Sequence, residues 1–180
     1  MTDRAWTVVR SRRVLEDAWF SLRADDCETP TGVPVDAYYV LDPPDFVLVL
    51  AFDSADRAVL VRQYRHPLGG LSLELPGGAV DPVEDALAAG ARELREETGY
   101  RAARLTPVIA LSPNPARYAN RVHLVRAEGA VPGPSAPEAS EDIEVVLVPR
   151  TELATLAASG EIVSAMHVGL ILAAMAREPG

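Results

Sequence analysis

The chain has 180 residues, of which 48% are hydrophobic and 24% are charged, and its formal net charge at pH 7 is −9. These proportions are typical of a globular protein with one domain, or with one domain and a small appendage. The acidic excess argues against a nucleic-acid surface, and no apolar stretch is long enough for a membrane span or a signal core. Cys27 is the only cysteine, which rules out an intrachain disulfide. We therefore expect a cytoplasmic protein that binds neither nucleic acid nor membrane.

Three short strands are expected near the N-terminus, over Trp6–Arg13, Phe20–Cys27 and Val35–Leu41. The turn Thr29–Gly32 joins the last two strands as a hairpin. Three strands alone bury little apolar surface, so this segment needs the main domain or a second subunit to cover it. The stiff sequence Asp42–Asp45 marks a boundary. We divide the chain into an N-terminal antiparallel β segment for dimerisation, residues 1–42, and a main domain, residues 43–180.

The main domain alternates between predicted strands and helices. Phe46–Phe52 is almost wholly apolar, which predicts a central strand buried on both faces. Further strands are expected at Ala58–Tyr64, Leu71–Leu75, Thr106–Leu111, Val122–Val125 and Ile143–Val148. A loop rich in proline, glycine and acids is expected over Ala127–Asp142, and two helices over Glu152–Ser159 and Val163–Ala176. This order predicts an α/β fold with a mixed sheet covered by helices on its faces.

A further helix is expected after Gly78. Asp81 followed by Pro82, with an acid at Glu84, predicts the helix start, and Gly99 predicts its end. The buried stripe is expected to contain Leu87, Ala91 and Leu94.

Three acids, Glu93, Glu96 and Glu97, fall on one flank of this predicted helix. Such neighbours repel one another, but clustered carboxylates are hard ligands for Mg²⁺ or Mn²⁺. Taken alone, the pattern E-x-x-E-E more often indicates a solvated acidic face. The wider pattern favours the metal.

The stretch from Gly78 to Tyr100 resembles the Nudix box. It has the box glycine, a glutamate six residues later, the sequence Arg92-Glu93-Leu94, the pair Glu96-Glu97 and the glycine before Tyr100. The resemblance implies an α/β/α sandwich and hydrolysis of a nucleoside diphosphate linked to another group. It also implies that Glu93 and Glu97 are the principal Mg²⁺ (or Mn²⁺) ligands, with Glu96 and the Gly77 carbonyl assisting. Glu84 and Arg92 would hold the box together.

Two upstream segments are similar to the ADP-ribose pyrophosphatase branch of this family. They are Val61–Arg65, V-R-Q-Y-R, and Glu74–Gly78, E-L-P-G-G. The resemblance implies substrate contacts from Arg65, Arg62 and Glu74. Because residues alternate along a strand, Arg62 and Arg65 face opposite sides, and we expect Arg65 to contact phosphate. The branch also implies a homodimer in which the N-terminal strands intertwine.

The downstream similarity is weaker. Pro115 stands about where the branch keeps a marker proline and is a further expected substrate contact, but Asn120 or Arg121 replaces the branch's usual acid. This departure bears on substrate choice. The general base of the branch is a loop glutamate, and Glu138 and Glu141 both lie near its position. Either could instead be a solubilising loop acid.

These features predict Mg²⁺-dependent hydrolysis of the pyrophosphate bond of a nucleoside diphosphate sugar, with ADP-ribose giving AMP and ribose 5-phosphate. Alternatives are a Nudix hydrolase of GDP-mannose, NADH, a diadenosine polyphosphate or a nucleoside triphosphate, and a sensor that binds a nucleotide sugar without cleaving it. His66, His123 and His167 have no metal-site spacing, and we expect hydrogen-bonded structural histidines.

Overall fold

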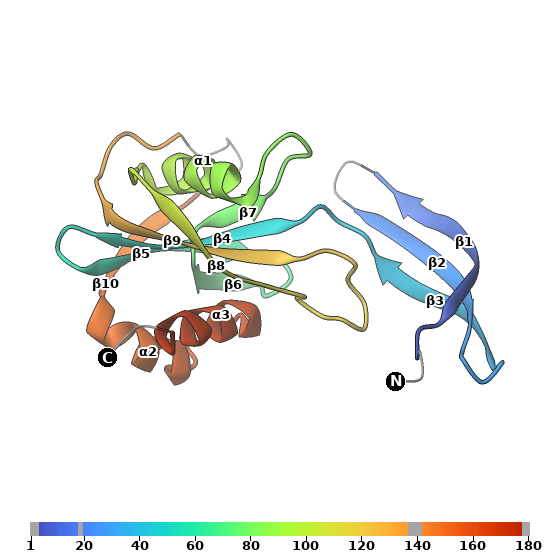
Figure 1. Ribbon diagram of the computed structural model, residues 1–180. Coiled ribbons are helices and arrows are strands. Elements are labelled where there is room, and N and C mark those ends of the chain that lie inside the picture. Colours follow the sequence, from blue (N-terminus) through green and yellow to red (C-terminus); the bar gives the residue numbers. More distant parts are fainter. Residues whose placement is uncertain (1–3, 18–19, 137–141, 178–180) are drawn as a thin grey trace. The chain divides into compact units, whose positions relative to one another are not determined.

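The computed structural model describes residues 4–17, 20–136 and 142–177. The chain divides into two compact units, each visible as its own group of elements in Figure 1. The first unit combines Met1–Pro44 with Ser112–Arg121, and the second combines Asp45–Leu111 with Val122–Gly180. Among the described residues, no helix is both long enough and apolar enough to cross a membrane.

The first unit is built on an antiparallel sheet of β1 (Thr7–Glu16), β2 (Ser21–Glu28) and β3 (Pro34–Leu41), in that order. The three predicted strands and their hairpin turn are confirmed. In the turn, the Gly32 N–H donates to the Thr29 carbonyl at 2.9 Å. Every residue of β1 is exposed in the single chain.

Large hydrophobic side chains lie uncovered on this sheet. Val8 is 56% exposed, Val9 68% and Leu15 51%. Trp6 is 47% exposed and packs edge-on against Tyr38. The first unit thus leaves apolar surface in water that a folded monomer would normally bury.

The second unit contains a mixed sheet, as predicted. Its strands run in the order β10-β5-β4-β9-β8, with β6 beside β5 and β7 beside β4. Only the β4–β9 pair is parallel among the described strands. The strands are β4 (Phe46–Asp53), β5 (Arg57–Arg65), β6 (Gly70–Glu74), β7 (Gly77–Ala79), β8 (Leu105–Leu111), β9 (Val122–Ala130) and β10 (Glu144–Pro149).

Helices cover both faces of this sheet, and alternation along β4 explains how. Val47 and Val49 point to one face, where they share a core with α1 (Ala86–Thr98). Leu48 and Leu50 point to the other, where they pack with residues of α2 (Arg150–Ser159) and α3 (Ala165–Met175). Figure 1 shows α1 on one side of the sheet and α2 and α3 on the other. The expected α/β/α sandwich is confirmed.

Helix α1 begins four residues later than predicted. Its N-cap is Asp85, which accepts hydrogen bonds from the backbone N–H groups of Leu87 and Ala88 at 3.0 and 2.8 Å. The reason lies in Glu84, which is bound by Arg92. In a continuous helix, residues eight positions apart are separated by about 12 Å along the axis, too far for that contact. The preceding segment therefore folds back as a turn.

Two other predictions about this region need correction. Ala91 is exposed, and the buried residues of α1 are Ala89, Gly90, Leu94, Glu97 and Thr98. The strand predicted at Val122–Val125 extends as β9 to Ala130, so part of the expected loop is strand. The predicted helix end is confirmed, because Gly99 adopts φ 75°, in the left-handed region, and donates to the Arg95 carbonyl.

Candidate active site

A cavity of about 380 Å³ lies in the second unit between the ends of the central strands and the acidic flank of α1. Strands β4 and β5 and the short β7 supply one side of its lining, and α1 with the turn before it supplies the other. The lining residues are Phe46, Gln63, Arg65, Gly77, Gly78, Ala79, Asp81, Arg92, Glu93, Glu96, Glu97 and Ala136. The three acids predicted as metal ligands thus share one cavity with Arg65.

Glu97 is the most buried of these acids, with 5% of its surface exposed. Its Oε2 accepts a hydrogen bond from the Gly77 backbone N–H at 2.9 Å. This bond joins the last turn of α1 to the start of β7. It also brings the Glu97 carboxylate next to Gly77, the residue whose carbonyl was predicted to complete the metal site.

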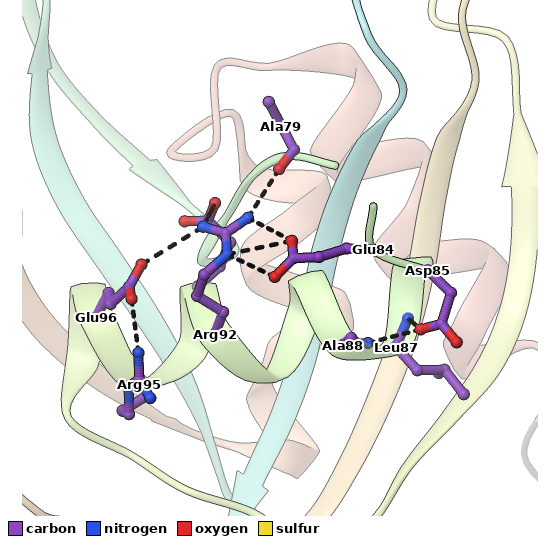
Figure 2. A network of polar contacts seen from close by, with 9 residues as sticks. Ala79, Glu84, Asp85, Leu87, Ala88, Arg92, Arg95 and Glu96 are labelled. Carbon is purple, nitrogen blue, oxygen red and sulfur yellow. Dashed lines mark hydrogen bonds and ion pairs between the residues drawn. The ribbon is translucent and has the colours of Figure 1, made fainter. Parts of the chain in front are cut away.

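Arg92 is the centre of an ion-pair network on α1, drawn in Figure 2. Its guanidinium donates to Glu84 at 3.0–3.2 Å, to the Ala79 carbonyl at 3.0 Å and to Glu93 at 2.7 Å, and reaches Glu96 at 3.4 Å. The hydrogen bond to Glu84, with that to Glu93, raises the pKa of Arg92 although partial burial opposes it, and the same bond lowers the pKa of Glu84. Arg92 therefore stays charged and fixes the turn before the helix to the helix itself, in line with the structural role predicted for this pair.

Gly78 allows β7 to pass close to the helix. A Cβ at this position would overlap the carboxylate of Glu93. The absence of a side chain therefore lets the acid reach the cavity wall, a close approach that only glycine permits.

Arg65 is clamped by Glu74 on the opposite side of the cavity. Its Nε and Nη2 donate to the two carboxylate oxygens at 3.0 and 2.7 Å. Burial alone would raise the pKa of Glu74, but hydrogen bonds from Arg65 and Ser72 outweigh it and lower the pKa. The side chain of Glu74 is 8% exposed and that of Arg65 is 44% exposed. The clamp therefore holds a half-exposed cation against the cavity through a buried anion.

The other predicted site residues lie elsewhere or were not described. Arg62, which precedes Gln63 on β5, pairs with Glu144 of β10 at 2.8 Å and does not line the cavity. Pro115 belongs to the first unit. Glu138 and Glu141 lie outside the described residues.

The sequence interpretation assigned no site role to five residues that line the cavity: Phe46, Gln63, Ala79, Asp81 and Ala136. Gln63 could have been found, because it lies two positions before Arg65 on the same face of β5. Asp81 had been interpreted as the helix cap. With the helix starting at Asp85, its side chain is left on the cavity wall instead.

The donor set suits a divalent cation, because three carboxylates and a backbone segment line one cavity, and such oxygens are the ligands that Mg²⁺ prefers. Among the described residues, no three acidic, histidine or cysteine side chains are already gathered as a preformed cage. Arg92 contacts two of the acids, Glu93 and Glu96, and partly neutralises them. A bound cation would take over that role once the side chains turned toward it.

Comparisons with known proteins point the same way. The family model of the NUDIX domain matches residues 42–165, and that of the nucleoside diphosphate sugar hydrolase N-terminal domain matches residues 6–41. A CMP-5'-(N-acetyl-N-hydroxy-3-aminopropyl)phosphonate hydrolase from Streptomyces rubellomurinus is 33% identical over 166 residues, which cover 90% of this chain and 79% of that protein. An ADP-ribose pyrophosphatase from Mycobacterium tuberculosis is 30% identical over 183 residues, covering 100% of this chain and 88% of that protein.

A solved structure described as an ADP compounds hydrolase has the same fold. It matches with a TM-score of 0.84 at 24% identity and covers 95% of this chain and 92% of its own.

Proposed function

The chain belongs to the Nudix family of hydrolases, and we propose that it cleaves the pyrophosphate bond of a nucleoside diphosphate sugar, with ADP-ribose giving AMP and ribose 5-phosphate. The observation that carries the proposal is the single cavity in which Glu93, Glu96 and Glu97 face a clamped Arg65. Further support comes from the N-terminal match to a nucleoside diphosphate sugar hydrolase domain and from the ADP-ribose pyrophosphatases among the relatives.

Mg²⁺, or Mn²⁺ in its place, would be held by Glu93 and Glu97, with Glu96 and the Gly77 carbonyl completing the site. When bound, the ion supplies charge for the diphosphate and acidifies a coordinated water. Hydrolysis of a phosphoanhydride needs positioning and charge neutralisation more than covalent help. Arg65 contacts a phosphate oxygen, and the two hydrogen bonds that it donates to Glu74 fix the plane of its guanidinium.

Glu138 or Glu141 is proposed as the general base. A base on a loop that closes over substrate would exclude bulk water as it completes the site. Glu138→Gln and Glu141→Gln variants, assayed in parallel, should differ sharply in turnover number. Equal, mild losses of turnover in both variants would mean that neither Glu138 nor Glu141 is the general base.

A homodimer is proposed in which a second copy covers the N-terminal sheet. The exposed valines of β1 and the exposure of that strand along its whole length support this assignment. Sedimentation equilibrium at micromolar concentration should give twice the mass of the chain. A monomer at that concentration would contradict the proposal.

A second candidate substrate is a cytidine monophosphate joined to a phosphonate. Its support is the Streptomyces relative, whose name gives it that activity and which is 33% identical to this chain over 166 residues. The chemistry is related, since a nucleotide phosphate is again the group released from an anhydride. The two candidates differ in the nucleobase and in the group beyond the second phosphorus.

The decisive experiment is a substrate panel in Mg²⁺ with phosphate counted after added phosphatase. The panel contains ADP-ribose, ADP-glucose, GDP-mannose, NADH, a CMP-linked phosphonate, a diadenosine polyphosphate and a nucleoside triphosphate. Glu97→Gln should lose about 100-fold or more in turnover, while Glu144→Gln, outside the cavity, should keep it. Rapid cleavage of ADP-ribose supports the proposal, and tight binding without cleavage of any compound would indicate a sensor.

A further inference from the structure

The segment Glu74–Gly77, which ends β6 and begins β7, is fixed by four consecutive contacts. Glu74 binds Arg65 of β5, and the Leu75 N–H donates to His167 of α3 at 3.0 Å. The Pro76 carbonyl accepts from Val49 of β4 at 2.9 Å, and the Gly77 N–H donates to α1. Each of the four residues is therefore held by a different element.

His167 is the contact in this set that comes from furthest along the chain. It lies in α3, is 4% exposed, and presents Nδ1 to the Leu75 N–H. A nitrogen that accepts a hydrogen bond carries no proton, so the ring is neutral with its proton on Nε2. That Nε2 lies 3.8 Å from Oε2 of Glu74, beyond hydrogen-bond length but close enough for the N–H dipole to favour the carboxylate.

These contacts form a chain from α3 to the cavity. His167 fixes the backbone at Leu75 and faces the Glu74 carboxylate, and that carboxylate fixes the guanidinium of Arg65 through two bonds. All members except Arg65 are buried and closely packed. A displacement of His167 is therefore expected to pass along the chain of contacts to Arg65.

We propose that His167 is a positioning residue for the substrate, which acts as a neutral hydrogen-bond acceptor through Leu75 and Glu74 to orient Arg65 toward a phosphate. The inference rests on the proposed function in taking Arg65 as the phosphate contact. It assigns the helix α3 a role in substrate binding beyond covering the sheet.

Two substitutions separate this role from simple core packing. His167→Leu fills the space but leaves the Leu75 N–H without an acceptor. His167→Asn keeps an acceptor oxygen at about the reach of Nδ1 and should restore function. Because removal of a buried acceptor also destabilises the fold, both variants are first compared by far-ultraviolet circular dichroism and urea unfolding.

The test is a double-mutant cycle with Arg65→Ala. In the Arg65 background, His167→Leu should raise the KM for ADP-ribose about tenfold with a smaller change in kcat, and His167→Asn should stay near the wild type. In the Arg65→Ala background, His167→Leu should change KM hardly at all, because the residue through which it acts is gone. Equal effects in both backgrounds would reduce His167 to a structural role and overturn the proposal.

A parallel measurement separates this inference from the choice of substrate. The same cycle is run on the dissociation constant of inorganic diphosphate in Mg²⁺, by isothermal titration calorimetry. Should ADP-ribose not be cleaved while diphosphate binding shows the same non-additivity, the proposed substrate fails and the positioning role stands. Additive effects on diphosphate, or no diphosphate binding by the wild type, would overturn the positioning role. The ¹⁵N resonances of His167 should in addition identify an unprotonated Nδ1, and a protonated Nδ1 would contradict it.

Discussion

Acidification should destabilise this protein before its carboxylates titrate, because of His167. Burial lowers the pKa of this imidazole from 6.5 to about 4, with Glu74 opposing the shift and Arg65 adding to it. His167 therefore becomes protonated near pH 6.5 in the unfolded chain but only near pH 4 in the folded chain. Since the unfolded state binds more protons in this window, stability is complete above the window and falls as the pH is lowered through it.

The size of the effect follows from the two pKa values. Between about pH 7 and about pH 5, the free energy of unfolding should fall by about 2 kcal/mol from His167 alone, and by about 3 kcal/mol once the pH is below the folded pKa. The stability that comes from the lowered pKa of Glu74 is lost only at lower pH, as the solution approaches the ordinary value of 4.5. The interval above pH 5 therefore isolates the histidine.

Urea unfolding at about pH 7, 6 and 5 measures this loss. His167→Asn, which cannot titrate, should show a nearly flat stability over the same interval. His66→Gln replaces an exposed histidine and should keep the slope of the wild type. If His167→Asn lost as much stability as the wild type between about pH 7 and about pH 5, the attribution of this pH dependence to His167 would be refuted.

Three further perturbations test the site and its helix. Asp85→Ala should lower the free energy of unfolding by about 1 kcal/mol through loss of the N-cap, while Asp81→Ala should change it by less than about 0.5 kcal/mol in the same urea titration. Gly78→Ala, whose Cβ displaces the Glu93 carboxylate, should raise the Mg²⁺ concentration for half-maximal turnover about tenfold, and Gly70→Ala, which meets nothing nearby, should not. Removal of divalent ions with EDTA should abolish turnover and weaken binding of ADP-ribose. An unchanged affinity for ADP-ribose by calorimetry would mean that the arginines bind the substrate without the ion.

The sheet could be predicted because its strands carry their own signals. Phe46–Phe52 is apolar at every position, and a strand of that kind is stable only with cover on both faces. The hairpin at Thr29–Gly32 was predicted from residues that favour turns, and the structure confirms it. In both cases the sequence signal lies within a few neighbouring residues.

The helix start could not be predicted because two acids compete for it. Asp81 with Pro82 has the composition of a cap, and so does Asp85. The outcome depends on Arg92, which binds the Glu84 side chain and the Ala79 carbonyl and so draws the intervening segment into a turn. Local composition gives the candidates, and a contact from a later turn of the helix decides between them.

Residues that meet across long sequence separations were the hardest to foresee. Alternation divided Arg62 and Arg65 between the two faces of β5, but which face borders the cavity depends on how the strand packs in the sheet. The hydrogen bond between Leu75 and His167 joins positions 92 residues apart. A lone histidine on a mostly apolar helix gives no signal of such a partner, and only its structural character could be predicted.

The charges around the cavity explain why a cation is central to the proposed chemistry. Four acids and two arginines line it: Asp81, Glu93, Glu96, Glu97, Arg65 and Arg92. Neither arginine is an isolated charge, since Arg65 is bound to Glu74, and Arg92 is bound to Glu84 in the turn before α1 and to Glu93 in the helix. A diphosphate entering this site would meet an excess of negative charge. A divalent ion reverses that balance, because the same acids that repel the phosphates then hold the charge that attracts them.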